Sequence, residues 1–336
     1  MNYIINRIRN INRGRFDYFA SKIAEQNSKS KSYVKLKMVL SFLRYGTSYT
    51  DYMKGNYINL TSKEKKEFIN DRNYRKLISY LNDENYQDIF LDKIKFNDKF
   101  KKYLGRDYLD LRHSSVKEFE KFLKGKESVF AKKHNSCGGD GVKKIVINND
   151  LNINNLYSTL LENKQYLVEE TIIQHDYLNK ISPTVVNNIR IVTLLKNGKV
   201  YIVANTIRLN TGNEEVISCE DIFATLDENG HLLGNVVDAD FNIYKEHPLT
   251  KFKFDNVTIP YVKEAIKMVK EAALIVPEIR YIGWDIAITN TGPVMIEGNF
   301  YPSYGLFQYY LFEDGKPVGK LKLIKEILGD EIKKAL

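Results

Sequence analysis

The stretch Ile282–Asn299 reads IGWDIAITNTGPVMIEGN. Two runs rich in β-branched residues flank a turn that contains asparagine and glycine, which is the pattern of a β-hairpin. A turn centred on Thr291 places Asp285 directly across from Glu297. Asn299 joins their face, because side chains two residues apart point to the same side of a strand. The predicted core face is the opposite one, formed by Trp284, Ile286, Ile288, Val294 and Ile296.

The two facing carboxylates of this hairpin need a partner. They repel each other, and partial burial penalises both charges. A hard divalent cation removes the conflict, and Mg²⁺ typically takes one or two carboxylates together with phosphate oxygens. The hairpin therefore predicts a magnesium site at Asp285, Glu297 and Asn299, and the competing interpretation is a solvated polar face without a metal.

A glycine-rich segment, HNSCGGDGV at residues 134–142, joins two predicted strands, and Lys132 ends the first of them. Glycines let backbone N–H groups approach an anion closely, and a lysine adds a point charge. The segment matches neither a Walker loop nor a dinucleotide-binding fingerprint, because a strand rather than a helix follows it. We expect Gly138, Gly139 and Gly141 to fold over a triphosphate as a flexible hairpin, and the alternative is a plain turn beside solvated lysines.

The composition is that of an ordinary globular protein of two or three domains, with 336 residues, 43% hydrophobic and 28% charged. No apolar run approaches the length of a membrane span, and the first residues lack the apolar stretch of a signal peptide. Two cysteines, Cys137 and Cys219, lack metal-ligand spacing. This usage predicts a reducing, cytoplasmic location and argues against a disulfide framework or a zinc site.

A net charge of +9 indicates anionic partners such as a nucleotide, a sugar phosphate, nucleic acid or a membrane surface. No nucleic-acid-binding module is recognisable, so we expect no specific nucleic acid partner. The first residues could form a basic amphipathic helix, which is compatible with peripheral membrane contact and, more simply, with packing on its own domain. Its basic and apolar residues are Arg7, Arg9, Arg13, Arg15, Ile4, Ile5, Ile8 and Ile11.

Helical spacing of apolar residues dominates up to about residue 90, for example over 34–43 and 63–81. Beyond residue 125 short β-rich runs alternate with turns, and Asn197-Gly198 between two alternating runs predicts a type I′ hairpin. Further helices are expected at 116–123, 155–162, 262–274 and 321–334. The predicted class is α+β with a mostly helical N-terminal region.

Five pieces of sequence occur in one order along residues 85–305. They are Lys93 after Asp92, Lys132 before the glycine-rich segment, YLVEETI at 166–172, NNIR at 187–190, and GWD at 283–285 with IEGN at 296–299. In this order the chain resembles the ATP-grasp superfamily, and most closely the sugar-transfer-associated ATP-grasp proteins found with polysaccharide biosynthesis genes. It departs from them at 218–224, which lacks a usual glycine pair, and at Lys133, where proline is common.

The resemblance implies three parts: a helical region at 1–110, a small lid at 111–172 and a larger antiparallel-sheet domain at 173–336. ATP would lie between the lid and the larger domain, with Mg²⁺ at the carboxylate hairpin. Lys93 and Lys132 would contact its phosphates under the glycine-rich segment. The adenine hinge would use backbone groups of Glu169, Glu170, Thr171 and Ile172, and His175 would approach the ribose.

Arg190 and Arg208 are, by the same resemblance, candidates for binding the transferred phosphate or the acceptor, alongside Lys132. Counting outward from the Asn197-Gly198 turn places Arg190 opposite Asn205 and Arg208 opposite Asn187. Strict alternation therefore puts the two arginines on different faces of the sheet. Either a bulge brings them together or only one is functional, in which case we favour Arg190.

The implied activity is that of an ATP-dependent carboxylate–amine ligase that forms an amide through an acyl phosphate. Such chemistry needs no side-chain nucleophile, and no catalytic triad is evident. The implied substrates are an amino acid and a sugar acid or amino sugar of a surface polysaccharide, or a sugar-linked acceptor, with polysaccharide biosynthesis enzymes as partners. The alternatives are a phosphotransferase acting on a sugar or alcohol, and a non-catalytic nucleotide-binding component of an assembly complex.

Overall fold

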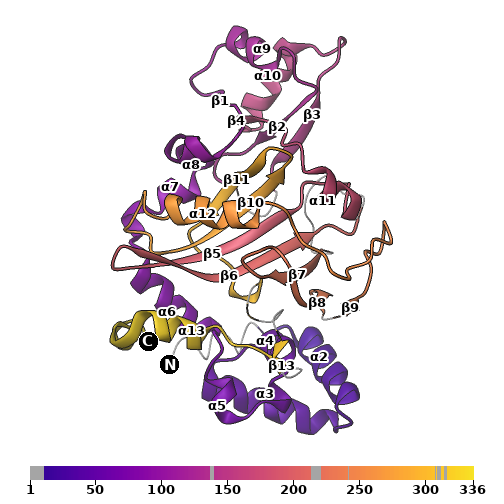
Figure 1. Cartoon of the computed structure of the whole chain (residues 1–336), viewed down its shortest axis with the longest axis vertical. Helices are drawn as coiled ribbons and strands as arrows, with labels where there is room; N and C mark the ends of the chain where they lie inside the picture. The colour runs from indigo at the N-terminus through magenta and orange to yellow at the C-terminus, as the bar shows by residue number, and fades with distance from the viewer. Residues whose placement is uncertain are drawn as a thin grey trace. The chain divides into compact units, whose positions relative to one another are not determined.

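The computed structural model describes residues 11–136, 140–212, 221–240, 242–306, 308, 312–313 and 316–336. The chain divides into two compact units (Figure 1). One runs up to Ile78 and includes Tyr304–Leu336, and the other is Ser79–Ser303. This division follows compactness, and the three-part division expected from the sequence stays a prediction. The predicted N-terminal basic helix falls mostly on residues 1–10, outside the described residues.

The first unit is mainly helical. Its helices are α2 (Arg13–Gln26), α3 (Lys31–Tyr45), α4 (Tyr49–Lys54), α5 (Ser62–Lys65), α6 (Asp71–Leu81, which continues into the second unit), α13 (Leu321–Leu328) and α14 (Ile332–Ala335). Short 3₁₀ turns lie at Tyr57–Asn59, Tyr304–Leu306 and Gly329–Glu331, and β12 (Phe312–Glu313) pairs with β13 (Lys316–Pro317).

The helical pattern at 63–81 is interrupted, because α5 and α6 are separate helices. Thr61 and Glu64 form a reciprocal capping box at the start of α5. The first helix ends at Lys65, and Asn70 caps the second: its side-chain oxygen accepts hydrogen bonds from the backbone N–H groups of Arg72 and Asn73, both 3.1 Å. An asparagine in that geometry starts a new helix rather than continuing the old one.

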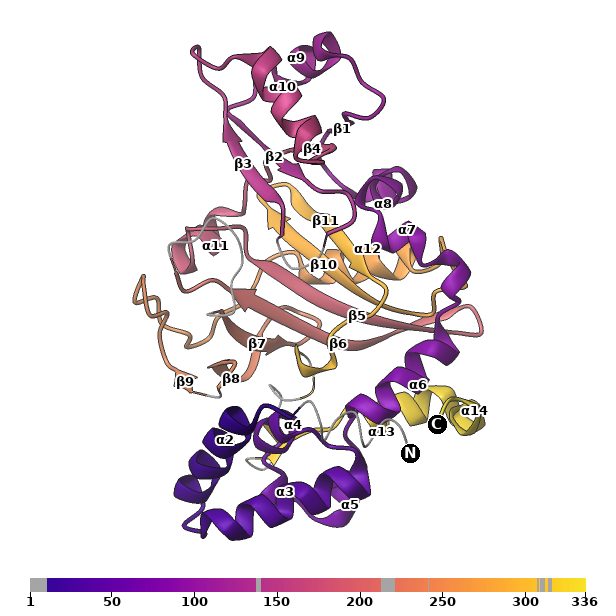
Figure 2. The ribbon, with the colours of Figure 1, turned by 180° about the vertical axis from the view of Figure 1, so that it is seen from behind.

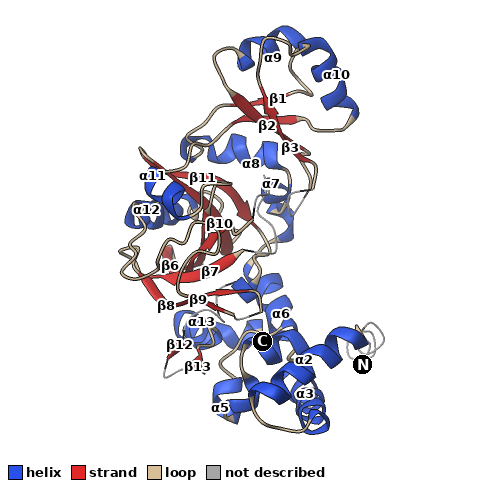
Figure 3. Cartoon of the chain, turned by 90° about the vertical axis from the view of Figure 1, so that its right-hand side faces the viewer, coloured by secondary structure: helices blue, strands red, loops and turns tan. Residues whose placement is uncertain are grey.

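The second unit contains two antiparallel sheets. The smaller, which we call the lid sheet, has the order β1-β4-β2-β3, formed by β1 (Tyr108–Asp110), β4 (Leu167–Glu170), β2 (Ser128–Lys132) and β3 (Val142–Val146). Helices α9 (Val116–Leu123) and α10 (Ile153–Glu162) cover one face of it (Figure 3). Phe119, Leu123 and Leu160 of these helices pack on alternate strand residues such as Val129 and Val168.

The larger sheet has the order β11-β10-β5-β6-β7-β8-β9. Its strands are β5 (Asn188–Lys196), β6 (Lys199–Leu209), β7 (Ile222–Leu226), β8 (Leu232–Asp238), β9 (Ile243–Tyr244), β10 (Tyr281–Thr289) and β11 (Gly292–Asn299). The predicted type I′ turn is confirmed between β5 and β6, since Asn197 and Gly198 both have positive φ, 50° and 74°.

Helix α12 (Val262–Ala272) packs on one face of the larger sheet and closes its main core. Its inward residues, Val262, Ala265, Val269 and Ala272, meet Trp284, Ile286, Ile191 and Ile207 in that core. Figure 2 shows the opposite face, which α12 does not cover. Shorter helices complete the unit: α7 (Asp88–Leu91), α8 (Lys93–Phe100) and α11 (Asp176–Ile181), with 3₁₀ turns at Glu84–Tyr86 and Lys101–Tyr103.

A β-bulge in the β10–β11 hairpin corrects the predicted core face. Asp285 does pair with Glu297, as predicted, but the turn lies between Thr289 and Gly292 and the register shifts after Asp285. Ile296 is the extra residue, so Met295 rather than Val294 or Ile296 joins the core. The prediction of Val294 and Ile296 as core-face residues was therefore wrong.

A second bulge, in the β5–β6 pair, corrects the predicted placement of the two arginines. The register shifts between Val192 and Thr193, so Arg190 pairs with Thr206, and Arg208 with Asn188. Cross-strand partners and residues two apart share a face. Arg190 and Arg208 therefore lie on the same face: the placement from strict alternation was wrong, and the alternative in which a bulge brings them together is confirmed.

Among the described residues, no helix is both long and apolar enough to cross a membrane.

Candidate nucleotide and metal site

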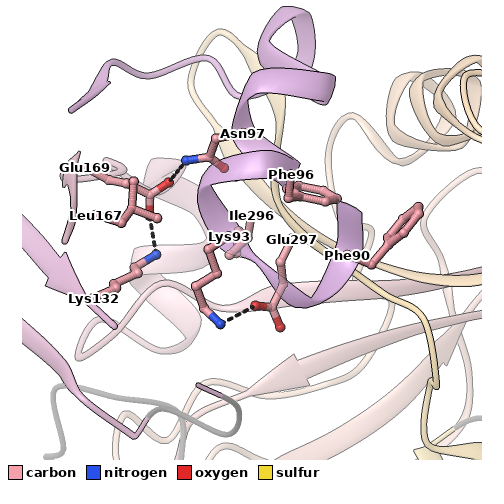
Figure 4. Close-up of a pocket in the computed structure, with 9 residues that line it drawn as sticks. All are labelled: Phe90, Lys93, Phe96, Asn97, Lys132, Leu167, Glu169, Ile296 and Glu297. Atoms are coloured by element: carbon pink, nitrogen blue, oxygen red, sulfur yellow. Dashed lines mark hydrogen bonds and ion pairs between the residues drawn. The ribbon is translucent and has the colours of Figure 1, made fainter. Parts of the chain in front are cut away.

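A small cavity collects four of the predicted site residues. Its walls come from α7, α8, β2, β4 and β11 (Figure 4). Lys93, Lys132, Glu169 and Glu297 supply its charged groups. The remaining lining residues are Phe90, Phe96, Asn97, Leu167 and Ile296.

Glu169 is the most strongly held group in the cavity. Its carboxylate accepts hydrogen bonds from Arg106 Nη2 at 2.6 Å, from Arg106 Nε at 3.1 Å and from Asn97 Nδ2 at 2.9 Å, and it forms an ion pair with Lys132. Arg106 also donates to the backbone carbonyl of Met295, 2.6 Å away. One carboxylate thus ties the lid sheet to α8 and, through Arg106, to β11.

The protonation state of Glu169 follows from these partners. Burial alone would raise its pKa, but the charges of Arg106 and Lys132, with the hydrogen bond from Asn97, lower the pKa of Glu169 to about 2. The group is therefore ionised at neutral pH although its side chain is only 3% exposed. Glu169 holds Lys132 in place at the cavity wall.

Lys93 connects the glycine-rich segment with the carboxylate hairpin. It opens α8, whose first turn is capped by the side chain of Asp92. Its backbone N–H donates to the carbonyl of His134 at 2.8 Å, and its ammonium donates to the carbonyl of Ser136. The same ammonium lies 4.0 Å from Glu297. The ammonium of Lys93 is therefore shared between the glycine-rich segment and the predicted metal site.

Gly298 explains part of the IEGN motif. A Cβ atom at this position would lie 2.7 Å from the ring of Phe96 and 3.0 Å from that of Phe90. Only glycine lets β11 approach α7 and α8 this closely. The close approach brings Glu297 to the lysine at the start of α8.

Asp285, Glu297 and Asn299 do converge, as predicted. The amide nitrogen of Asn299 lies 3.4 Å from a carboxylate oxygen of each acid. Arg190 donates hydrogen bonds from two guanidinium nitrogens, Nε and Nη2, to the carboxylate of Asp285, and Nη2 lies 2.7 Å from Oδ2. No group of three or more His, Cys, Asp or Glu side chains suited to a metal exists in the described part of the chain. The acids here form a pair completed by an amide.

Glu297 has the unfavourable negative charge that the sequence predicted for two facing carboxylates. Partial burial and the neighbouring Asp285 charge raise its pKa, while Lys93 and Arg190 oppose the shift. Around the cavity and the hairpin, three carboxylates face four cations: Asp285, Glu297 and Glu169 against Lys93, Lys132, Arg106 and Arg190. The net local charge of +1 suits a polyanion that arrives with a divalent cation.

A polar row continues from this hairpin across the face of the larger sheet opposite α12. Asp285 pairs with Arg190, Arg190 with Thr206, and Thr206 with Thr225 on β7. Arg208 lies beside this row and forms an ion pair with the fully buried Asp221. The sheet therefore has one apolar face under α12 and one polar face.

The other predicted residues lie apart from the cavity or outside the described residues. Gly138 and Gly139 belong to the latter, whereas Gly141 accepts a hydrogen bond from Gln165 Nε2 at 2.9 Å. Glu170 ends β4, and Thr171 and Ile172 follow it in the chain. The hydroxyl of Thr171 forms hydrogen bonds with Ser128. His175 caps α11 and donates its backbone N–H to Ile288.

Sequence reasoning missed Arg106, Asn97 and Asp221. Arg106 follows Gly105, whose φ of +58° marks a turn, but nothing near it in the sequence indicates a buried carboxylate partner. Asn97 is one polar residue among the apolar positions of α8. Only the tertiary structure brings them to Glu169, 63 and 72 residues further along the chain.

A family model described as sugar-transfer associated ATP-grasp matches residues 125–311, more than half of the chain. The chain belongs to the sugar-transfer associated ATP-grasp family. The predicted fold class, α+β of the ATP-grasp type with a helical N-terminal region, is confirmed. No curated protein matches the sequence.

Solved structures similar to this ATP-grasp protein include three synthetases or ligases. D-alanyl-alanine synthetase A of Vibrio cholerae is 14% identical with a TM-score of 0.44, covering 73% of this chain and 66% of that one. An L-amino acid ligase of Bacillus licheniformis is 12% identical (TM-score 0.38; 63% and 41% covered). N5-carboxyaminoimidazole synthetase of Staphylococcus aureus is 13% identical (TM-score 0.39; 64% and 46% covered). The chain thus spans 41–66% of their lengths.

Proposed function

We propose that this protein is an ATP-dependent carboxylate–amine ligase. The observation that carries the proposal is the small cavity that Lys93 and Lys132 line together with Glu297, which is the cross-strand partner of Asp285. Family membership supplies the class of nucleotide, and the cluster supplies groups suited to its phosphates. Substrates and pathway are part of the proposal.

The hairpin fits Mg²⁺ by the chemistry of its donors. Two carboxylates and an amide provide hard oxygen ligands, and phosphate oxygens would complete the set. Asn299 offers its amide nitrogen to both acids here, so a half-turn of the amide would present its oxygen instead. The raised pKa of Glu297 indicates two acids held closer than their charges favour. A bound Mg²⁺ would neutralise charge on the transferring phosphoryl group.

The lysines are proposed to hold the nucleotide phosphates. Lys132 is oriented by Glu169, and the ammonium of Lys93 by the backbone carbonyl of Ser136. The backbone of Glu169 pairs with β1 and β2, and that of Glu170 pairs with β2 and donates its N–H to the carbonyl of Asp107 at 3.0 Å. We therefore assign the adenine hinge to the residues that follow β4, Thr171 and Ile172, with His175 near the ribose.

The reaction needs no protein nucleophile. A substrate carboxylate oxygen bonds to the γ-phosphorus, the bond to the β–γ bridging oxygen breaks, and ADP leaves with an acyl phosphate formed. An amine then attacks the acyl carbon, inorganic phosphate departs, and the nitrogen loses a proton to give an amide. We assign Arg190 to the transferred phosphate, and its position next to Asp285 in the sheet supports this role. We assign Arg208 to the acceptor, since it lies two residues from Thr206 on the same face.

The acceptor class is proposed from the family description, which concerns sugar transfer. An amino acid joined to a sugar acid or amino sugar of a surface polysaccharide fits this description. The same reasoning places the enzyme in the cytoplasm, where ATP is available, beside enzymes that build the polysaccharide.

One assay tests the reaction class. ADP and phosphate release should require a carboxylate and an amine together, in a screen of amino acids against uronic acids and amino sugars. ATP consumption with a hydroxyl acceptor and no free phosphate would instead show a phosphotransferase. Nucleotide binding without turnover across the screen would favour a non-catalytic role.

A further inference from the structure

Three polar atoms on the face of the larger sheet opposite α12 have no hydrogen-bond partner in the part of the chain that the structure describes. Thr206 Oγ1, Thr225 Oγ1 and Asn188 Oδ1 are buried, and none has a hydrogen bond within the described residues. Their residues are only 2%, 6% and 5% exposed. Buried polar atoms are normally paired, so an unpaired set on one surface indicates groups kept for a ligand.

The register places these atoms together and beside the proposed reaction centre. Thr206 pairs directly with Thr225 and with Arg190, and Asn188 pairs with Arg208. The two threonine hydroxyls are cross-strand neighbours, yet neither bonds the other. The row reaches Asp285 one strand beyond Arg190.

The local charge balance selects the ligand. Arg190 is paired with Asp285, and Arg208 with Asp221. With both guanidinium groups matched by carboxylates, the unpaired polar groups beside them are neutral hydroxyl and amide groups. Hydroxyls both donate and accept, whereas an amide oxygen only accepts, so the fitting ligand carries hydroxyl or amine donors.

We propose that Asn188, Thr206 and Thr225 form a subsite for the uncharged, polyhydroxylated part of the acceptor, a sugar ring. This inference rests on the proposed function, which supplies the reacting end of the acceptor near Arg190. It adds a specificity surface of neutral groups that the arginines alone do not provide.

The test compares Thr206→Val and Thr225→Val, singly and together, with Thr193→Val. Thr193 is an equally buried threonine of the same sheet, but its hydroxyl already accepts a hydrogen bond from Trp284 Nε1 at 2.9 Å. Calorimetric titration uses D-glucosamine and D-galacturonate as probes, with Mg²⁺ and a non-hydrolysable ATP analogue present. Each subsite valine should weaken sugar binding about tenfold, as for one lost hydrogen bond, and leave Tm equal or higher.

Thr193→Val should do the reverse, lowering Tm and leaving sugar binding unchanged. The subsite is overturned if wild type binds neither sugar, if the double variant binds them as wild type does, or if Thr206→Val lowers Tm as much as Thr193→Val. Failure of wild type to bind the ATP analogue would instead overturn the proposed function, so the two failures are distinguishable.

A separate observation concerns α3 in the first unit. Five large apolar side chains of this helix are exposed by 43–56% of their surface, and they recur at helical spacing on one side. We call this set the α3 stripe: Tyr33, Leu36, Val39, Leu40 and Leu43. The other side of α3 buries Val34 and Met38 in its own unit. A helix of a globular protein rarely has two apolar sides unless the second contacts something.

The charge around the α3 stripe is strongly positive. Among the described residues up to Gly46, residues 11–46 contain eight Lys or Arg and two Asp or Glu, a net charge of +6, whereas the whole chain carries +9. Lys37 and Arg44 are exposed on α3 itself, and Lys37 lies 5.3 Å from the ring of Tyr33. An apolar stripe bordered by basic side chains matches the interface of an anionic lipid membrane.

We infer that the α3 stripe docks on the surface of an anionic membrane, independently of the proposed reaction. Its leucines and valine would enter the headgroup boundary, and Lys37 and Arg44 would meet lipid phosphates. The charge concentration favours a lipid surface over an uncharged protein partner.

Vesicle sedimentation of the full chain tests this surface. We expect binding to equimolar phosphatidylcholine and phosphatidylglycerol, little binding to phosphatidylcholine alone, and release in high salt. Leu36→Ser with Leu40→Ser should reduce partitioning at least about tenfold, because each exposed leucine contributes apolar burial. Leu249→Ser with Leu274→Ser, which alters leucines of similar exposure in the second unit, should bind as wild type.

Two results would overturn the membrane surface. One is equal binding of wild type and Leu36→Ser/Leu40→Ser to anionic vesicles. The other is a wild-type dimer in sedimentation velocity that the same double variant converts to a monomer without any vesicle binding, since the α3 stripe would then join two copies.

Discussion

Replacing Glu169 by glutamine should cost this protein a large part of its stability. The substitution keeps the size of the side chain but removes the charge that faces Arg106 and Lys132. Both cations would stay at a site where the carboxylate is 3% exposed. Removing one member of a buried ion pair is strongly destabilising because the other is left uncompensated, typically by ~3–5 kcal/mol.

The pKa of Glu169 gives an independent magnitude. It is about 2 in the folded protein and 4.5 for the ordinary side chain. At ~1.4 kcal/mol per pH unit, the ionised form therefore contributes roughly 3 kcal/mol at neutral pH. The folded pKa is lowered, so the contribution is present above pH 4.5 and is lost as the pH falls toward 2. The difference between wild type and Glu169→Gln should shrink over that range.

Urea unfolding followed by tryptophan fluorescence measures this effect. Trp284 is the single tryptophan, fully buried in the core of the second unit, and lies on the strand next to β11. The neighbouring Glu170 provides the control, because its side chain is 39% exposed and lies 3.9 Å from Lys126. Glu170→Gln should change the free energy of unfolding by less than about 1 kcal/mol.

The reasoning is refuted if Glu169→Gln and Glu170→Gln unfold at the same urea concentration at pH 7. It is equally refuted if the gap between wild type and Glu169→Gln is as large at pH 3 as at pH 7, since the gap would then not come from ionisation of the carboxyl group.

Three further predictions follow from the hairpin. Because the pKa of Glu297 is raised, its charge opposes folding at neutral pH, and Glu297→Gln should raise the Tm of the nucleotide-free protein at pH 7. The gain in Tm should vanish below pH 4.5, and turnover should fall at least about 100-fold. A lower Tm of the variant at pH 7 would contradict this. Arg190→Lys breaks the two-pronged contact with Asp285 and should lower stability by about 1–3 kcal/mol in urea unfolding, whereas an unchanged midpoint would show that the contact is not formed. Gly298→Ala should destabilise by about 1–3 kcal/mol by pushing the ring of Phe96, and wild-type stability would show that the close approach is absent.

The sequence predicted local structure correctly where a residue type strongly favours one backbone conformation. Asn197-Gly198 adopts positive φ at both positions, and the alternation on either side then sets a hairpin. The pairing of Asp285 with Glu297 was also predicted, although the turn centre was misplaced by half a residue and the bulge at Ile296 restored the register. The predicted pairing was therefore correct only because the error in the turn centre and the unpredicted bulge compensate each other.

Bulges and long-range ion pairs were not readable in this way. The bulge at Val192 in the β5–β6 pair moves Arg208 onto the face of Arg190. No residue type at this place predicts the position of the bulge, because a bulge is set by how neighbouring strands twist and pack. Arg106 finds Glu169 only after two elements have packed. The site was thus predictable as a set of residue types along the chain, but Arg106, the buried cation that joins Glu169 to β11, was not.

The central claim is that the carboxylate hairpin binds Mg²⁺ together with a nucleotide. Calorimetric titration of a non-hydrolysable ATP analogue, with and without Mg²⁺, tests it most directly in wild type and in Asp285→Asn/Glu297→Gln. Wild type should bind the analogue far more tightly with Mg²⁺ than without, and the double variant should lose that difference while its fold persists. Equal Mg²⁺ dependence in both proteins would contradict the account.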